Sequence, residues 1–162
     1  MTGVLLSDAT APRSLSLRPL TRDGDMLTAE AVAVDGDRRW RLAGPLLSLD
    51  EAAELGAWLA GLPGDLTLGA DEWTTLASAS SALSFAGRRV PGGVVELRVS
   101  VLGMTPVDGT APDGAEPETG GAQSSAASLP RSTDVVLGLS LPAAAVERAA
   151  VALVSETAAL RS

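Results

Sequence analysis

The chain has 162 residues, of which 20 are acidic and 12 are basic, giving a formal net charge of −8. This balance argues against nucleic acid as a partner, because phosphate binding needs clustered positive charge. Cysteine, histidine, lysine and tyrosine are all absent, which excludes disulfides, thiolate metal sites, Ser-His or Cys-His catalysis and Schiff-base chemistry.

The sequence also indicates where in the cell the protein is expected and what kind of partner it is expected to bind. No apolar run reaches the ~18 residues of a membrane helix, and the segment Met1–Ser7 lacks the basic start of a signal peptide. We therefore expect a cytoplasmic protein with no membrane partner, no cofactor and no bound metal. The acidic excess fits a basic protein partner through electrostatic steering, with plain solubility as the alternative explanation.

The N-terminal part predicts a tail followed by strands. Residues 1–13 show no periodicity, and we predict a flexible tail there, followed by a single domain over 14–162. Pro19 would place the first strand at a sheet edge or mark its end, and the turn Asp35-Gly36-Asp37 joins the next two strands as a hairpin. Alternation of apolar and polar residues predicts strands over Ser14–Leu20, Asp25–Val34 and Arg38–Leu42.

The segment Ser48–Ala60 is predicted to form a helix. Ser48 and Glu51 have the spacing of a capping box, in which each side chain bonds the free backbone N–H of the other residue. Leucine and alanine recur at helical spacing through the segment. Gly61 suits the C′ position, and Pro63 marks the end of the helix.

The second half of the chain predicts further strands and a closing helix. Residues 103–133 are rich in Gly, Pro, Ser, Ala and Thr, lack apolar anchors and carry acidic side chains. We therefore predict a flexible acidic insertion there. Pro142 suits the first turn of a helix that continues to Leu160. The strands predicted in this half are Leu66–Leu68, Ala82–Ala86, Val94–Leu102 and Asp134–Leu141.

The order of these elements indicates the fold class. Strands interrupted by one helix and closed by another are typical of an α+β domain. One polar face on the strand Val94–Leu102 indicates antiparallel pairing. We predict a twisted, mainly antiparallel sheet of about six strands with two packed helices.

Five residues in turns and loops are candidates for partner contact. Asp35 and Asp37 flank Gly36, but a calcium loop would need further oxygen ligands, so a turn is the better interpretation. Asp71 and Glu72 precede Trp73; such a pair could do acid–base chemistry, but neighbouring side chains on a strand point to opposite faces, so a solvated turn is the better interpretation. Because strands and helices are committed to the core, the predicted partner-binding residues are Asp35, Asp37, Asp71, Glu72 and Trp73. No catalytic residue is predicted.

Arginines gather in two places. Arg38, Arg39 and Arg41 surround Trp40, and Arg88-Arg89 precedes the Pro91-Gly92-Gly93 turn. A small-anion site is conceivable at either place. The alternative is the charged outer face of a half-buried strand.

The segment Gly36–Leu62 combines a strand with Trp40, a Pro45-Leu46 turn and a helix that ends in Trp58-Leu59. In these features it resembles the middle of the WapI family of bacterial immunity proteins. Looser similarity extends to most of the chain outside residues 1–13 and 103–133. The resemblance implies a cytoplasmic antidote that binds and neutralises a bacterial toxin, and it carries over no catalytic residue.

Three functions stay open at this point. The first is a non-enzymatic immunity protein that occludes a basic toxin domain. The second is a small cofactor-free biosynthetic enzyme, of cyclase or isomerase type, that uses a carboxylate in an apolar pocket. The third is a structural or assembly module, which a large exposed apolar face or a symmetric dimer would favour.

Overall fold

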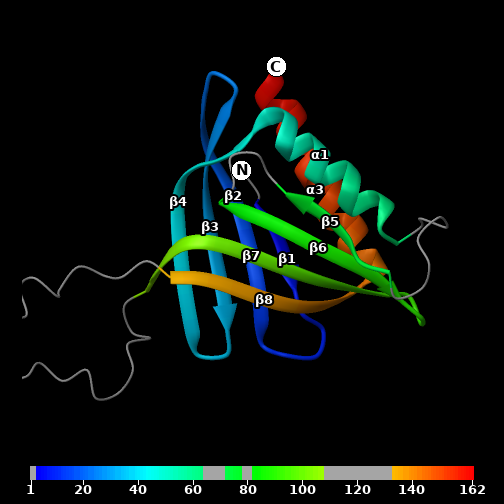
Figure 1. The fold of residues 1–162 in the computed structure, drawn as a ribbon. Coiled ribbons are helices and arrows are strands. Elements are labelled where there is room, and N and C mark those ends of the chain that lie inside the picture. Colours follow the sequence, from blue (N-terminus) through cyan, green and yellow to red (C-terminus); the bar gives the residue numbers. More distant parts are fainter. Residues whose placement is uncertain (1–2, 64–71, 78–81, 108–132) are drawn as a thin grey trace, which may run out of the picture.

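The computed structural model describes residues 3–63, 72–77, 82–107 and 133–162 (Figure 1). It confirms the predicted α+β class: these parts of the chain form a curled antiparallel sheet and two helices. The sheet has 8 strands rather than about six. The strands are β1 (Val4–Ser7), β2 (Arg13–Asp23), β3 (Met26–Asp35), β4 (Arg38–Ser48), β5 (Thr74–Ala77), β6 (Leu83–Val90), β7 (Val94–Pro106) and β8 (Thr133–Pro142), and the helices are α1 (Leu49–Gly61) and α3 (Ala143–Arg161).

Strand β7 joins two halves of the sheet. The strand order is β1-β2-β3-β4-β7-β6-β5, and β8 also pairs with β7. Most of β7 lies between β6 and β8, and only its last residues, Thr105 and Pro106, pair with β4. In Figure 1 the first half-sheet (β1–β4) lies behind, the second half-sheet (β5–β8) crosses in front of it, and both helices lie on one side.

Alternation along the strands builds the core between the two half-sheets. Strand β7 buries Val95, Leu97, Val99 and Val101 on one face, and β8 buries its alternate residues from Val135 to Leu141 in the same way. The intervening residues of these strands face outward, as the pleat requires. The second half-sheet therefore has one apolar inner face and one exposed, more polar outer face.

Helix α1 begins as predicted. Ser48 is the N-cap: its Oγ accepts from the backbone N–H of Glu51 at 3.1 Å, and Glu51 Oε2 accepts from the Ser48 N–H at 2.7 Å. The predicted C-terminus is wrong by one position. Gly61 is the last helical residue, and the C-cap Leu62 keeps right-handed backbone angles, so no glycine in the left-handed region is needed.

The predicted tail at residues 1–13 is also wrong, because it contains β1. Val4 pairs with Leu17 of β2, and Leu6 pairs with Leu15. The Val4 and Leu6 side chains are each 2% exposed. A strand of 4 residues is too short for its alternation to stand out in the sequence. Burial of two apolar side chains offsets the entropy of ordering this short segment.

The predicted insertion over 103–133 is wrong at its first residues. Gly103 to Pro106 belong to β7, where Met104 is fully buried. Residues 108–132, which make up most of the predicted insertion, lie outside the described residues, as does the predicted strand Leu66–Leu68. Within the described parts, neither helix combines the length and apolar character that crossing a lipid bilayer requires.

Candidate functional site

The outer face of the second half-sheet carries a row of charged and aromatic side chains. The strand register places Arg88 of β6 opposite Glu96 of β7, and Arg98 of β7 opposite Gly138 of β8. The Arg88 and Glu96 side chains form an ion pair with a nitrogen–oxygen distance of 2.6 Å. Among the described residues, Arg98 has no carboxylate within ion-pair distance.

Trp73 covers this row at the β5 end. Its ring centroid lies 4.9 Å from the guanidinium carbon of Arg88 and 4.9 Å from that of Arg98, which is the range of a cation–π interaction. The side chain is 37% exposed, so one part of the ring contacts the arginines and another part meets solvent. This exposure leaves Trp73 accessible for the partner contact that was predicted for it.

Packing beneath β5 holds Trp73 in this place. Thr74, the next residue, pairs with Gly87 of β6, and its Oγ1 lies 3.5 Å from Nε1 of Trp58 in α1. A Cβ atom on Gly87 would lie 3.1 Å from the Trp58 ring and 3.0 Å from Leu62, so the absence of a side chain lets α1 approach the sheet. The aromatic anchor is thus positioned by the core rather than by a loop alone.

The opposite end of the row is formed by Asp8, which follows β1. Its carboxylate accepts four hydrogen bonds: Oδ1 from Thr10 N–H at 2.6 Å, Thr10 Oγ1 at 2.8 Å and Ala11 N–H at 2.9 Å, and Oδ2 from Ser140 N–H at 2.8 Å. Burial acts to raise the Asp8 pKa, but these hydrogen bonds, led by the one from Ser140, outweigh burial and hold the pKa below its ordinary value. Asp8 therefore stays ionised near neutral pH.

Arg13 connects this end to the β3–β4 hairpin. Its Nη1 donates to the Gly138 carbonyl at 3.0 Å, and its Nε lies 3.3 Å from Oδ1 of Asp35. Together these side chains line an open groove of about 290 Å³, here called the Trp73 groove. It is lined by Asp8, Thr10, Arg13, Trp73, Arg88, Glu96, Leu97, Arg98, Gly138, Leu139 and Ser140.

The predicted contact residues fall at different places around this groove. Trp73 forms one end of it, with Glu72 beside it in the chain, and Asp35 is joined to the other end through Arg13. Asp37 is exposed on the hairpin turn and does not line the groove. Asp71 lies outside the described residues.

Sequence reasoning missed the groove's charged lining. Glu96 and Arg98 were readable as outward residues of β7, but no pattern indicated that Arg88, Arg13 and Asp8 would join them from three other segments. The outer-face interpretation of Arg88 is confirmed, since it pairs across the sheet with Glu96.

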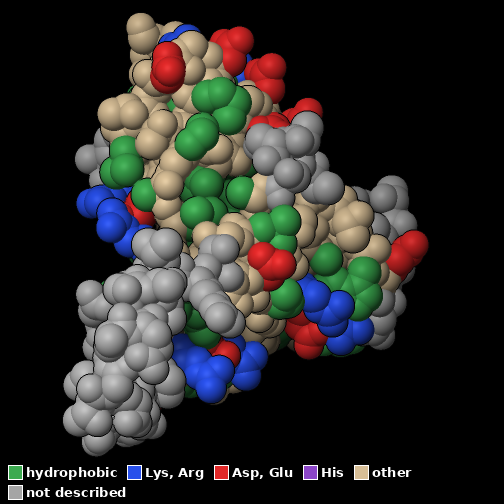
Figure 2. Space-filling view, turned by 60° about the vertical axis from the view of Figure 1, so that its left-hand side comes forward, with side chains coloured by type: hydrophobic (Ala, Val, Ile, Leu, Met, Phe, Trp, Pro, Cys, Tyr) green, Lys and Arg blue, Asp and Glu red, His purple; other side chains and the backbone are tan. Residues whose placement is uncertain are grey.

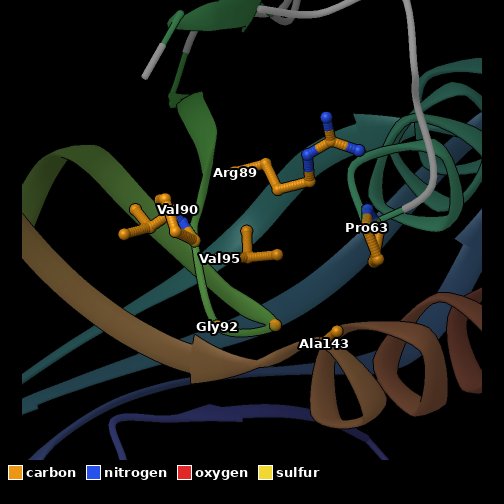
Figure 3. Close-up of a pocket in the computed structure, with 8 residues that line it drawn as sticks. Pro63, Arg89, Val90, Gly92, Val95 and Ala143 are labelled. Carbon is orange, nitrogen blue, oxygen red and sulfur yellow. The ribbon is translucent and has the colours of Figure 1, made fainter. Parts of the chain in front are cut away.

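A second cavity lies at the tip of the β6–β7 hairpin (Figure 3). It has a volume of about 270 Å³ and is lined by Pro63, Arg89, Val90, Pro91, Gly92, Gly93, Val95 and Ala143. Figure 3 shows Arg89 reaching across it from β6 toward Pro63, with Ala143 at the start of α3 on the other side. The Ala143 N–H donates to the Gly93 carbonyl at 2.9 Å, and apart from Arg89 the lining side chains are apolar or absent.

Charge is not gathered into a single field on the visible surface. Figure 2 shows acidic and basic side chains intermixed in small groups over the face it displays. No family model matches the chain, and no curated protein or solved structure matches it either.

Proposed function

We propose that this chain is a non-catalytic protein-binding module that contacts its partner through the Trp73 groove, in the manner of an immunity protein that neutralises a toxin. The observation that carries the proposal is Trp73, which is 37% exposed and lies over two arginines. Tryptophan and arginine are the residue types most enriched among the side chains that dominate binding energy.

Preorganisation supports the same proposal. Arg88 and Arg98 stand on paired strands, and the Trp73 ring restricts the motion of both guanidinium groups. Because these side chains are already ordered, binding of a partner would cost little side-chain entropy. Such preorganisation increases affinity.

The carboxylates of the groove favour binding over acid–base chemistry. Glu96 is paired with Arg88, and Asp8 accepts four hydrogen bonds that lower its pKa, which makes it a weak base. An apolar space beneath α3 is about 20 Å³ in volume, room for about one water molecule. These features weigh against a cyclase or isomerase that works through the groove or through that space.

The net charge indicates the kind of partner. An overall charge of −8 favours approach of a basic protein domain through long-range attraction. Asp35 and Asp37 at the hairpin turn are exposed, as is Glu72 beside the groove, so they can contribute to this attraction. A basic toxin domain is the partner that the proposal names.

The proposal is tested by producing the chain together with the protein encoded beside its gene. We expect the two proteins to co-purify, growth to be restored when the neighbour is toxic, and association to slow as salt rises. Trp73→Ala should speed dissociation by about tenfold or more, as for an anchor residue.

Val151→Ala is the matched control, because Val151 is also an exposed apolar residue, at 66%, but lies on α3 away from the groove. If both substitutions change the dissociation rate equally, the groove is not part of the interface. Absence of a complex at low salt, together with turnover of a small metabolite, would overturn the proposal.

A further inference from the structure

The charges of the Trp73 groove are unequally satisfied. Arg88 is neutralised by Glu96, and Arg13 is neutralised by Asp35 and also donates to the Gly138 carbonyl. Arg98 differs: within the described residues its guanidinium lies over the Trp73 ring but has no carboxylate partner.

We infer that Arg98 is the receptor for a carboxylate, and that the groove takes an acidic side chain carried by an extended segment of the partner. This inference rests on the proposed binding function and adds the chemistry of the group that is recognised. Because the partner domain as a whole is expected to be basic, the carboxylate is a local feature of the segment that enters the groove.

The arrangement of Arg98 suits a carboxylate. A guanidinium can stack on an aromatic ring through its face and still donate two parallel hydrogen bonds from its edge. The Trp73 ring, 4.9 Å from the guanidinium carbon, holds the group at the exposed outer face of β7. Asp8 does not compete for Arg98, since four hydrogen bonds occupy its oxygens at the other end of the groove.

The shape of the groove favours a peptide over a free small anion. The groove is open and runs from Trp73, beside β5, across β6, β7 and β8 to Arg13 and Asp8. At ~4.8 Å between neighbouring strands this path is roughly 15–20 Å long, the length of about five or six extended residues. Gly138 and Ser140, which also line it, add backbone groups along the path.

The test measures binding of fluorescein-labelled hexaglutamate to the full chain by fluorescence anisotropy at about 0.15 M salt, which screens the long-range repulsion between the acidic probe and a chain of net charge −8. Hexaglutamine is the uncharged probe, and we expect it to bind about tenfold more weakly or worse, the effect of about 1.4 kcal/mol. Arg98→Gln should weaken hexaglutamate binding by about tenfold. Arg98→Lys, which keeps the charge but loses the planar fork, should fall between wild type and Arg98→Gln.

Arg148→Gln is the matched control, since Arg148 is an exposed arginine on α3 and the substitution changes the net charge equally. If it weakens binding as much as Arg98→Gln does, the attraction is non-specific and the inference is wrong. A thymidine hexanucleotide that binds as tightly as hexaglutamate, with the same dependence on Arg98, would also overturn it in favour of a single-stranded nucleic acid site.

Two further outcomes separate this inference from the proposed function. If the partner complex depends on Trp73 but Arg98→Gln leaves both it and hexaglutamate binding unchanged, the binding function stands and the carboxylate site fails. If hexaglutamate binds in an Arg98-dependent way but no partner complex forms, the site stands and the antidote function fails.

Discussion

The outer faces of the two half-sheets carry the same kinds of charged groups in different arrangements. On the first half-sheet Glu30 pairs with both Arg18, at 3.1 Å, and Arg41, and its side chain is only 14% exposed. On the second half-sheet Glu96 pairs with Arg88 alone and is 36% exposed. In each case there are two arginines to one glutamate, but on the second half-sheet the remaining arginine lies over Trp73.

The comparison shows that the same kinds of charged residues can either neutralise one another or leave one cation without a carboxylate. Around Glu30 both cations share one carboxylate, so the group satisfies itself and needs no ligand. Around Glu96 the Trp73 ring holds Arg98 without neutralising it. A cation held by an aromatic face keeps hydrogen-bond donors for another molecule. The first arrangement is a stabilised surface, and the second has the features of a recognition site.

The largest effect is expected where the groove rests on the core. Leu97 lies between Glu96 and Arg98 in the chain, points to the opposite face and is 1% exposed. Leu97→Ala should lower the free energy of unfolding by about 2–5 kcal/mol, through lost burial and the cavity left behind. Chemical denaturation with a linear extrapolation measures this. A loss below about 1 kcal/mol would mean that the core collapses around the cavity left by Leu97→Ala, and that the floor of the groove is not rigid.

A smaller effect is expected at Asp8. Asp8→Asn removes a charged acceptor of four hydrogen bonds and should destabilise the fold by about 1–3 kcal/mol at neutral pH. Because the folded-state pKa is lowered, the stabilisation by Asp8 is complete above its ordinary pKa near 3.8 and is lost as the pH falls through the lower, folded-state value. Stability curves of the wild type and of Asp8→Asn should therefore converge in acid. Curves that stay parallel down to acid pH would rule out this role.

The smallest effects sharpen the comparison of the two faces. Glu30→Gln should destabilise the protein by about 1 kcal/mol, and Glu96→Gln by about 0.2–1 kcal/mol because it is more exposed and loses one ion pair rather than two. The binding readout should reverse this order. Glu96→Gln frees Arg88 and should strengthen hexaglutamate binding, whereas Glu30→Gln should leave it unchanged. The same response from both variants would mean that the net charge, not the groove, governs binding.

The sequence predicted the fold class and the local features that depend on neighbours in the chain. The cap at Ser48 and the inner face of β7 follow from short-range spacing, and both are confirmed. Strand β1 was missed because Val4 and Leu6 become a pattern only when paired with β2. Long-range pairing of this kind has no short sequence signal.

The candidate site was predictable only at its anchor. Trp73 was among the five predicted contact residues, and it is 37% exposed and lines the groove. The arginines around it come from separate strands, and Asp8 comes from a segment predicted to be a tail. Their meeting depends on the register of three strands and on the path of the chain between β1 and β2, neither of which composition or spacing determines.

The contact between the β1–β2 connection and β8 also concerns the solubility of the folded protein. Ala9 N–H donates to the Ser140 carbonyl at 2.9 Å, and Ser140 N–H donates to Asp8 at 2.8 Å, so Ser140 on the edge of β8 bonds within the molecule. An open strand edge is a template on which a second chain can add and start aggregation. By bonding both backbone groups of Ser140, the short segment after β1 leaves less of this edge open to a second chain, on a strand whose outer surface also exposes Val136.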